Sequence, residues 1–153
     1  MYIYALLVAL AVIFAIFLAP LRHKVWVATG VTAIAAGTAI TLAVMSLTGG
    51  VIELAHLSTE LFGSETFKVD ALSSLFLVII ALASVAVVLY SRGYVESYLK
   101  RFSSAHISLH YTALVTLCVS MMLVLMSSGG FSFLFSWELM TIASFLLILF
   151  EAE

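Results

Sequence analysis

The feature that most constrains this chain is a series of apolar stretches, each long enough to cross a lipid bilayer as a helix. One helical crossing needs about twenty predominantly apolar residues. Five such stretches are predicted, at approximately 2–21, 25–48, 71–90, 110–128 and 131–150. Of the 153 residues, 65 % are hydrophobic and 9 % are charged, whereas a soluble domain has roughly 25 % charged residues. The sequence predicts one all-α domain over residues 1–153, a multi-pass membrane bundle of five transmembrane helices.

The polar connections between these stretches differ in charge. Arg22 and Lys24 follow the first stretch, and Arg92, Lys100 and Arg101 follow the third. The connection after the second stretch is net acidic. Because positively charged loops stay in the cytoplasm, we expect the N-terminus outside and the C-terminus in the cytoplasm. The expected location is the inner (cytoplasmic) membrane of a cell.

The acidic connection 49–69 has apolar residues at mixed spacing, which fits either an interfacial helix or a short hairpin. His56, within it, is interpreted as a solvated or interfacial histidine. Asp70 then precedes Ala-Leu-Ser, an order typical of a helix N-cap in which the carboxylate accepts backbone N–H groups. The sequence therefore predicts that a helix begins just after Asp70.

Small side chains recur every four residues in the second stretch, at Thr29, Ala33, Gly37 and Thr41. Small residues let helix backbones approach closely in lipid. We therefore expect this stripe to pack against a neighbouring helix.

Residues with catalytic or metal-binding chemistry are scarce. Cys118 is the one cysteine and lies in an apolar run, which favours a packing role. The chain has no CxxC, no His/Cys cluster, no P-loop and no GxGxxG. We expect no metal, no cofactor and no catalytic residue in this chain, and no binding of nucleic acid.

One carboxylate interrupts the last apolar stretch. Glu138 is the eighth residue of 131–150, so at 1.5 Å per residue it lies roughly 10 Å from the start of that stretch. An ionisable group at this depth costs about 2.5–3.5 kcal/mol on insertion scales. Two interpretations follow: a proton or ion site that faces other helices, or a neutral structural acid bonded to a neighbouring helix, with Thr141 contributing one turn away.

His110 begins the predicted fourth stretch, beside the basic connection. A capping or interfacial role is favoured for it, with membership of a proton path as the alternative. The candidate for ion translocation is thus Glu138, with Thr141 and His110 as accessory residues.

Two passages carry a resemblance to a known family. They read FKVDALSSLFLVIIALASVAVVLYSRGYV at 67–95 and FSFLFSWELMTIASFLLILFE at 131–151. In this combination and order they resemble the antiporter-like membrane subunits shared by respiratory complex I (NADH:quinone oxidoreductase), energy-converting hydrogenases of the hydrogenase-4 type, and multi-subunit Na⁺/H⁺ antiporters. The resemblance runs over essentially the whole chain but covers only the beginning of the family's length.

The resemblance implies a larger bundle built from inverted repeats. In that family a glutamate on the fifth helix, which carries over to Glu138, is paired with a lysine on a later, broken helix. Because residues 1–153 do not include that later helix, we expect this chain to be the N-terminal portion of a proton- or sodium-translocating subunit. Its partners would be the remaining helices (from the same gene or a split chain), other subunits of a redox-driven oxidoreductase or antiporter complex, and lipid.

Two alternatives stay open: a structural or assembly subunit without its own ion path, and a truncated copy without function. If the intact complex is an oxidoreductase, its electron-transfer chemistry belongs to other subunits. The choice between H⁺ and Na⁺, and among the three family branches, is also open.

Overall fold

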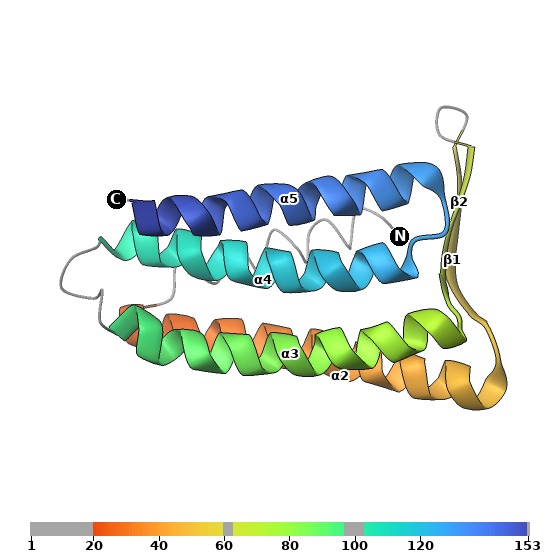
Figure 1. The fold of residues 1–153 in the computed structure, drawn as a ribbon, viewed down its shortest axis with the longest axis horizontal. Coiled ribbons are helices and arrows are strands. Elements are labelled where there is room, and N and C mark those ends of the chain that lie inside the picture. The colour runs from red at the N-terminus through yellow and green to blue at the C-terminus, as the bar shows by residue number, and fades with distance from the viewer. Residues whose placement is uncertain (1–19, 60–62, 97–102, 153) are drawn as a thin grey trace.

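The computed structural model describes residues 20–59, 63–96 and 103–152. Within these ranges the chain forms four helices and one two-stranded antiparallel hairpin (Figure 1). The elements in order are α2 (Leu21–Gly49), β1 (Ile52–Thr59), β2 (Gly63–Val69), α3 (Ala71–Glu96), α4 (Ser104–Met126) and α5 (Gly130–Ala152). The predicted span 2–21 lies almost entirely outside the described residues.

All four described helices are long and apolar enough to cross a membrane, and each corresponds to one predicted span. The helical membrane bundle is therefore confirmed, while a fifth span and the orientation of the termini stay predictions. Two helices begin earlier than expected, α2 at Leu21 rather than 25 and α4 at Ser104 rather than 110. The predicted boundaries stopped at polar residues, but a polar side chain fits inside a helix wherever a neighbouring helix supplies its hydrogen-bond partners.

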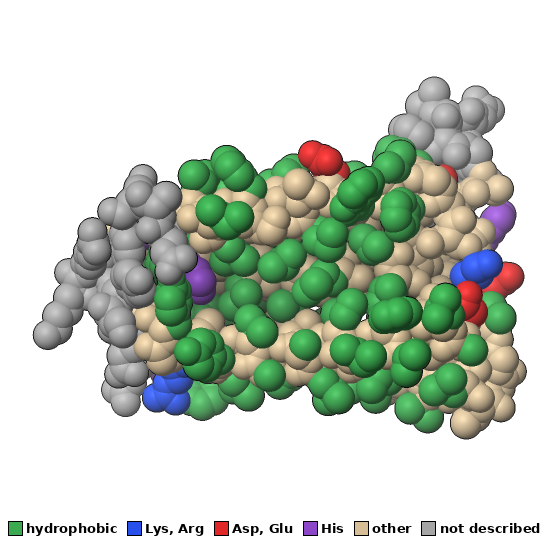
Figure 2. Space-filling model, in the orientation of Figure 1, with side chains coloured by type: hydrophobic (Ala, Val, Ile, Leu, Met, Phe, Trp, Pro, Cys, Tyr) green, Lys and Arg blue, Asp and Glu red, His purple; other side chains and the backbone are tan. Residues whose placement is uncertain are grey.

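The helices form two antiparallel pairs that lie side by side (Figure 1). α2 packs along α3, α4 packs along α5, and α4 also contacts both members of the first pair. The hairpin lies across one end of the bundle, here called the hairpin end. The opposite end, where α2 and α4 begin and α3 finishes, is called the basic end. Hydrophobic side chains run along the visible face between the two ends, and Lys and Arg side chains gather near them (Figure 2).

The buried core consists of two clusters shared among α2, α3 and α4. The cluster nearer the basic end includes Val88, Ile107, Tyr111 and Cys118, and the other includes Leu77 and Met122 together with small residues of α2. Cys118 is buried in the first cluster, which agrees with the packing role expected for it.

The predicted small-residue stripe of α2 is not the face that packs on the neighbouring helices, so this prediction was wrong. Ala33, Gly37 and Thr41 are exposed and Thr29 is half-buried. The buried positions of this helix include Ala28, Thr32, Ala36, Ala39, Ala43 and Ser46. Four residues turn a helix by about 400°, so a strict four-residue repeat drifts by about 40° at each step. The observed stripe mixes steps of four and three, and so stays on one face.

The acidic connection 49–69 folds as the β1–β2 hairpin and not as an interfacial helix. His56 is exposed on β1, with Nδ1 3.1 Å from Oγ1 of Thr66 on β2. This exposure agrees with the solvated or interfacial role expected for His56.

The helix start predicted after Asp70 is confirmed. The Ser73 N–H donates to Oδ1 of Asp70 at 2.8 Å. This bond holds the pKa of the Asp70 carboxyl below its ordinary value. Asp70 thus fixes the junction between β2 and α3.

Candidate functional site

Glu138 lies eight residues after the first residue of α5, about 12 Å along the helix at 1.5 Å per residue. Its side chain is exposed. Across the three described ranges, no hydrogen bond or ion pair joins its carboxylate to another residue. The residue is therefore a lone carboxylate well inside an apolar helix.

The face of α5 that carries Glu138 is rich in exposed aromatic and aliphatic side chains. They include Leu134, Phe135, Trp137, Ile142, Phe145 and Ile148. The opposite face turns Ser132, Ser136 and Ala143 inward, where they are buried. Among the described elements, α5 packs mainly on α4 and touches β2. Glu138 therefore projects from a face on which none of the described helices packs.

Thr141 is one turn from Glu138 and is also exposed. Its hydroxyl donates to the carbonyl oxygen of Trp137, within the same helix, at 3.0 Å. The structure therefore places the two candidates on the same side of α5 without a hydrogen bond between them.

His110 is not at a helix end, so the capping role favoured for it is wrong, while the interfacial role stays a prediction. α4 begins at Ser104, and its N-cap is Ser103, whose Oγ accepts the His106 N–H at 3.4 Å. His110 lies within the helix and is 7 % exposed. The prediction failed because the apolar pattern alone placed the helix start six residues too late.

The His110 ring lies among aromatic side chains from three helices. Its centroid is 4.6 Å from that of Phe150, 5.4 Å from that of Tyr111 and 6.1 Å from that of Tyr94. Neither ring nitrogen has a hydrogen-bond partner within the described part of the chain. Phe150 is twelve residues beyond Glu138 on α5, about 18 Å along the axis. The fold therefore does not bring His110 and Glu138 together.

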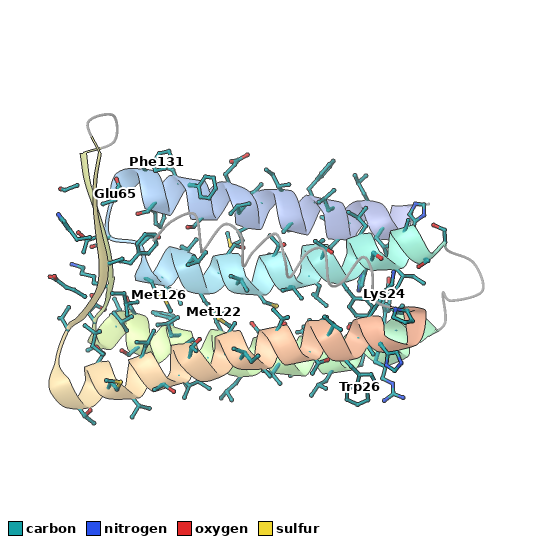
Figure 3. The ribbon with its side chains drawn as sticks, turned by 180° about the vertical axis from the view of Figure 1, so that it is seen from behind. Lys24, Trp26, Glu65, Met122, Met126 and Phe131 are labelled. Atoms are coloured by element: carbon teal, nitrogen blue, oxygen red, sulfur yellow. The ribbon has the colours of Figure 1, made fainter. Side chains whose placement is uncertain are left out.

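Lys24, which was predicted to lie in a polar connection, is instead a buried cation. It lies in the first turns of α2 and is 1 % exposed. Its Nζ donates to the carbonyl oxygen and the hydroxyl of Ser104, both at 3.0 Å, and to the hydroxyl of Ser108. These bonds join α2 to α4 at the basic end (Figure 3). The one sequence signal was the four-residue spacing of the two serines, which is too common to identify a partner.

Glu65 on β2 is a buried anion at the hairpin end, beside the start of α5 (Figure 3). Its Oε1 accepts the Phe131 N–H at 3.1 Å, and its Oε2 accepts the Ser132 N–H at 3.0 Å and the Ser132 hydroxyl at 2.7 Å. The bonds from Ser132, the hydroxyl first, hold the pKa of Glu65 below its ordinary value. In the sequence, Glu65 is one of several acids in the connection 49–69, and no local pattern distinguishes it from the others.

The chemistry that the Glu138 carboxylate offers is proton exchange. No group of three or more His, Cys, Asp and Glu side chains lies close enough to hold a metal ion within those residues. Glu138 can gain and lose one proton, and nothing in the described part of the chain competes for its carboxylate oxygens.

Residues 62–103 match the family model described as NADH-Ubiquinone oxidoreductase (complex I), chain 5 N-terminus. Over this segment, the resemblance to the antiporter-like subunit family is confirmed. The matched segment contains all of β2, the Asp70 cap and all of α3. Glu138 lies outside the match, so its correspondence to the glutamate of the antiporter-like subunits still rests on the Trp-Glu-Leu-Met passage. No curated protein sequence matches this chain.

Proposed function

We propose that this chain is part of an antiporter-like subunit that translocates protons or sodium ions in a redox-driven membrane complex of the complex I or hydrogenase-4 type. Glu138 is the proton acceptor and donor of that path. The observation that carries the proposal is a lone carboxylate, well inside an apolar membrane helix, on a face that the described helices leave open.

The position of Glu138 requires a further protein segment that packs on this face of α5. A carboxylate facing lipid costs several kcal/mol, on the order of 2.5–3.5 by insertion scales, so this face of α5 is covered by protein in the working complex. A cation on the covering helix stabilises the ionised carboxylate, and its withdrawal favours the protonated acid. Such a pair can take up and release one proton as the cation moves.

Lys24 does not supply that cation. All three of its hydrogen bonds go to Ser104 and Ser108 at the basic end, and it forms no ion pair with Glu138. We therefore place the cation on a helix beyond the described residues, in the same subunit or in a neighbouring one.

The proposed orientation puts the hairpin end outside the inner membrane and the basic end in the cytoplasm. It is supported by the positions of Lys24 and Arg92, near the start of α2 and the end of α3, which place two basic connections at one end. Positive charge is retained on the cytoplasmic side.

The test replaces Glu138 with Gln in the complete protein within its membrane complex. Ion pumping by membrane vesicles should fall by about tenfold or more, a loss of roughly 1.4 kcal/mol or more in barrier height, because the amide cannot carry the proton. Assembly, measured on native gels, should stay close to normal. Glu53→Gln is the matched control, since it makes the same change at an exposed carboxylate on β1. Normal pumping by a normally assembled Glu138→Gln complex would refute the proposal.

One alternative is favoured by the same open face of α5. Its large side chains, among them Phe135 and Trp137, suit a surface that only docks another subunit, with Glu138 as a neutral hydrogen-bonding bridge. Under that alternative Glu138→Gln leaves transport per assembled complex unchanged, and any loss is a loss of assembly.

A further inference from the structure

The start of α5 is attached to a part of the chain far away in sequence. Glu65, 7 % exposed on β2, accepts two backbone N–H groups and one hydroxyl from the first turn of that helix. The first four N–H groups of a helix have no partner within the helix, and a negative charge at this end is stabilised by the helix dipole. From outside the helix, Glu65 therefore gives two of these N–H groups an acceptor and places a negative charge at the start of α5.

Gly129 makes this approach possible. A Cβ at this position would collide with the Glu65 carboxylate, and even Oε1 would lie only 2.8 Å from it. At the next residue, Gly130, an added Cβ meets nothing within 4 Å. The two adjacent glycines thus differ in one respect that can be tested, which is whether a methyl group would displace the carboxylate.

Strand β2 is itself anchored to the bundle by the residues that follow Glu65. The Ser128 N–H donates to the Thr66 carbonyl oxygen at 2.9 Å, and Phe67 forms a β-bridge with Ser127 in the turn between α4 and α5. At the end of the strand, the carbonyl oxygen of Val69 accepts the Ser46 hydroxyl of α2 at 2.9 Å. The strand therefore gives α5 a reference point that is fixed to the rest of the bundle.

We infer that Glu65 is a positioning residue for Glu138: by clamping the first turn of α5 to β2, it sets the depth and rotation of this helix and so the place of the Glu138 carboxylate. The inference rests on the function proposed for Glu138. Ser132 is six residues before Glu138, about 9 Å along a continuous helix, where a slip of one residue would turn the carboxylate by about 100°. Among the described elements, α4 is the one helix that packs extensively on α5. The hydrogen bonds to Glu65 therefore contribute much of what holds α5 in position.

The first experiment measures the position of α5 directly. A nitroxide spin label is placed at Thr141→Cys, an exposed site one turn from Glu138, in the complete subunit in lipid vesicles, in a cysteine-free background that includes Cys118→Ser. Label depth is read from its relative accessibility to oxygen and to a water-soluble nickel complex. Glu65→Ala should change the depth of the label. Glu53→Ala, which removes an exposed carboxylate of β1, should not.

The two glycines supply a second variant that removes no group from the protein. Gly129→Ala should reproduce the change in label depth because its methyl group displaces the carboxylate, whereas Gly130→Ala should leave the depth as it is. In the Glu65→Ala background, Gly129→Ala should add nothing further. If Glu65 only stabilised the fold, its variants would lower the yield of folded subunit while the label depth in the folded fraction stayed unchanged. That result would overturn the inference.

Ion transport by the complete complex separates the inference from the function on which it rests. Glu65→Ala and Gly129→Ala should lower transport several-fold while Gly130→Ala does not. Unchanged label depth in both Glu65→Ala and Gly129→Ala overturns the positioning role, whatever transport does. A changed label depth together with normal transport in these variants and in Glu138→Gln supports the positioning role and overturns the proposed ion path.

Discussion

α4 and α5 are both 23 residues long and similarly apolar, yet they occupy different positions in the bundle. In α4, 44 % of the most apolar stretch is buried against other parts of the protein, whereas in α5 the share is 17 %. α4 contacts α2, α3 and α5, while α5 packs on α4 and touches β2. Lipid tails are as apolar as an aliphatic side chain, so apolar side chains are about equally stable against lipid and against another helix. Hydropathy therefore identifies both spans but does not distinguish the central helix from the outer one.

The two helices also begin differently. α4 starts on a local cap, Ser103, three residues before the N–H it accepts, and is tied to α2 by the buried Lys24. α5 starts against the charged side chain of Glu65 on a separate strand. The central helix is held by packing along its length, and the outer helix depends more on the attachment of its first turn.

The largest expected effect comes from removing the same side-chain atoms from each helix. Ile107 in α4 is 1 % exposed and Ile148 in α5 is 68 % exposed. Ile107→Ala should lower the free energy of unfolding by about 2 kcal/mol, because it leaves a cavity among packed helices. Ile148→Ala should change it by less than about 0.5 kcal/mol. Both are measured by denaturant titration of the chain in detergent, and equal costs would show that α5 is as central as α4.

The part of the structure that could be predicted is the part encoded by neighbouring residues. The apolar stretches predicted the four described helices, and the Asp70 cap was recognised because donor and acceptor are three residues apart. The two buried charges were missed because their partners are remote: Lys24 is 80 residues from Ser104, and Glu65 is 67 residues from Ser132. No local pattern distinguishes such residues from solvent-exposed loop charges.

In the candidate site, too, a local feature could be predicted from the sequence, whereas features that depend on the packing of the helices could not. Glu138 was identified because an acid within an apolar stretch is visible from composition alone. Its exposure was not predictable, since that depends on which face of α5 meets α4. The interior position of His110 was missed because three helices converge on it, an arrangement that only the assembled bundle creates.

A smaller effect, which depends on pH, should separate the two helix starts. The pKa of Glu65 is lowered in the folded protein from its ordinary value of 4.5, so its stabilising contribution is fully present above that value and is lost as the pH falls through the folded pKa. The wild type should therefore unfold at a higher denaturant concentration than Glu65→Gln at neutral pH, and this difference should shrink in acid. A difference that stays constant down to about pH 3 would show that the charge of Glu65 does not hold α5.

The smallest effect is expected at the local cap of α4. Replacing an N-cap serine with alanine typically costs about 1 kcal/mol, but the bond from the His106 N–H to Ser103 is 3.4 Å long and both residues lie toward solvent. Ser103→Ala should therefore cost about 0.5 kcal/mol or less, measured by the same titration, and should not alter the depth of a spin label at Thr141→Cys on α5. Packing along the whole of α4 keeps this helix in place without its cap. A cost above 1 kcal/mol, or a changed label depth, would mean that the central helix also depends on its first turn, and the contrast between the two helices would then be one of burial alone.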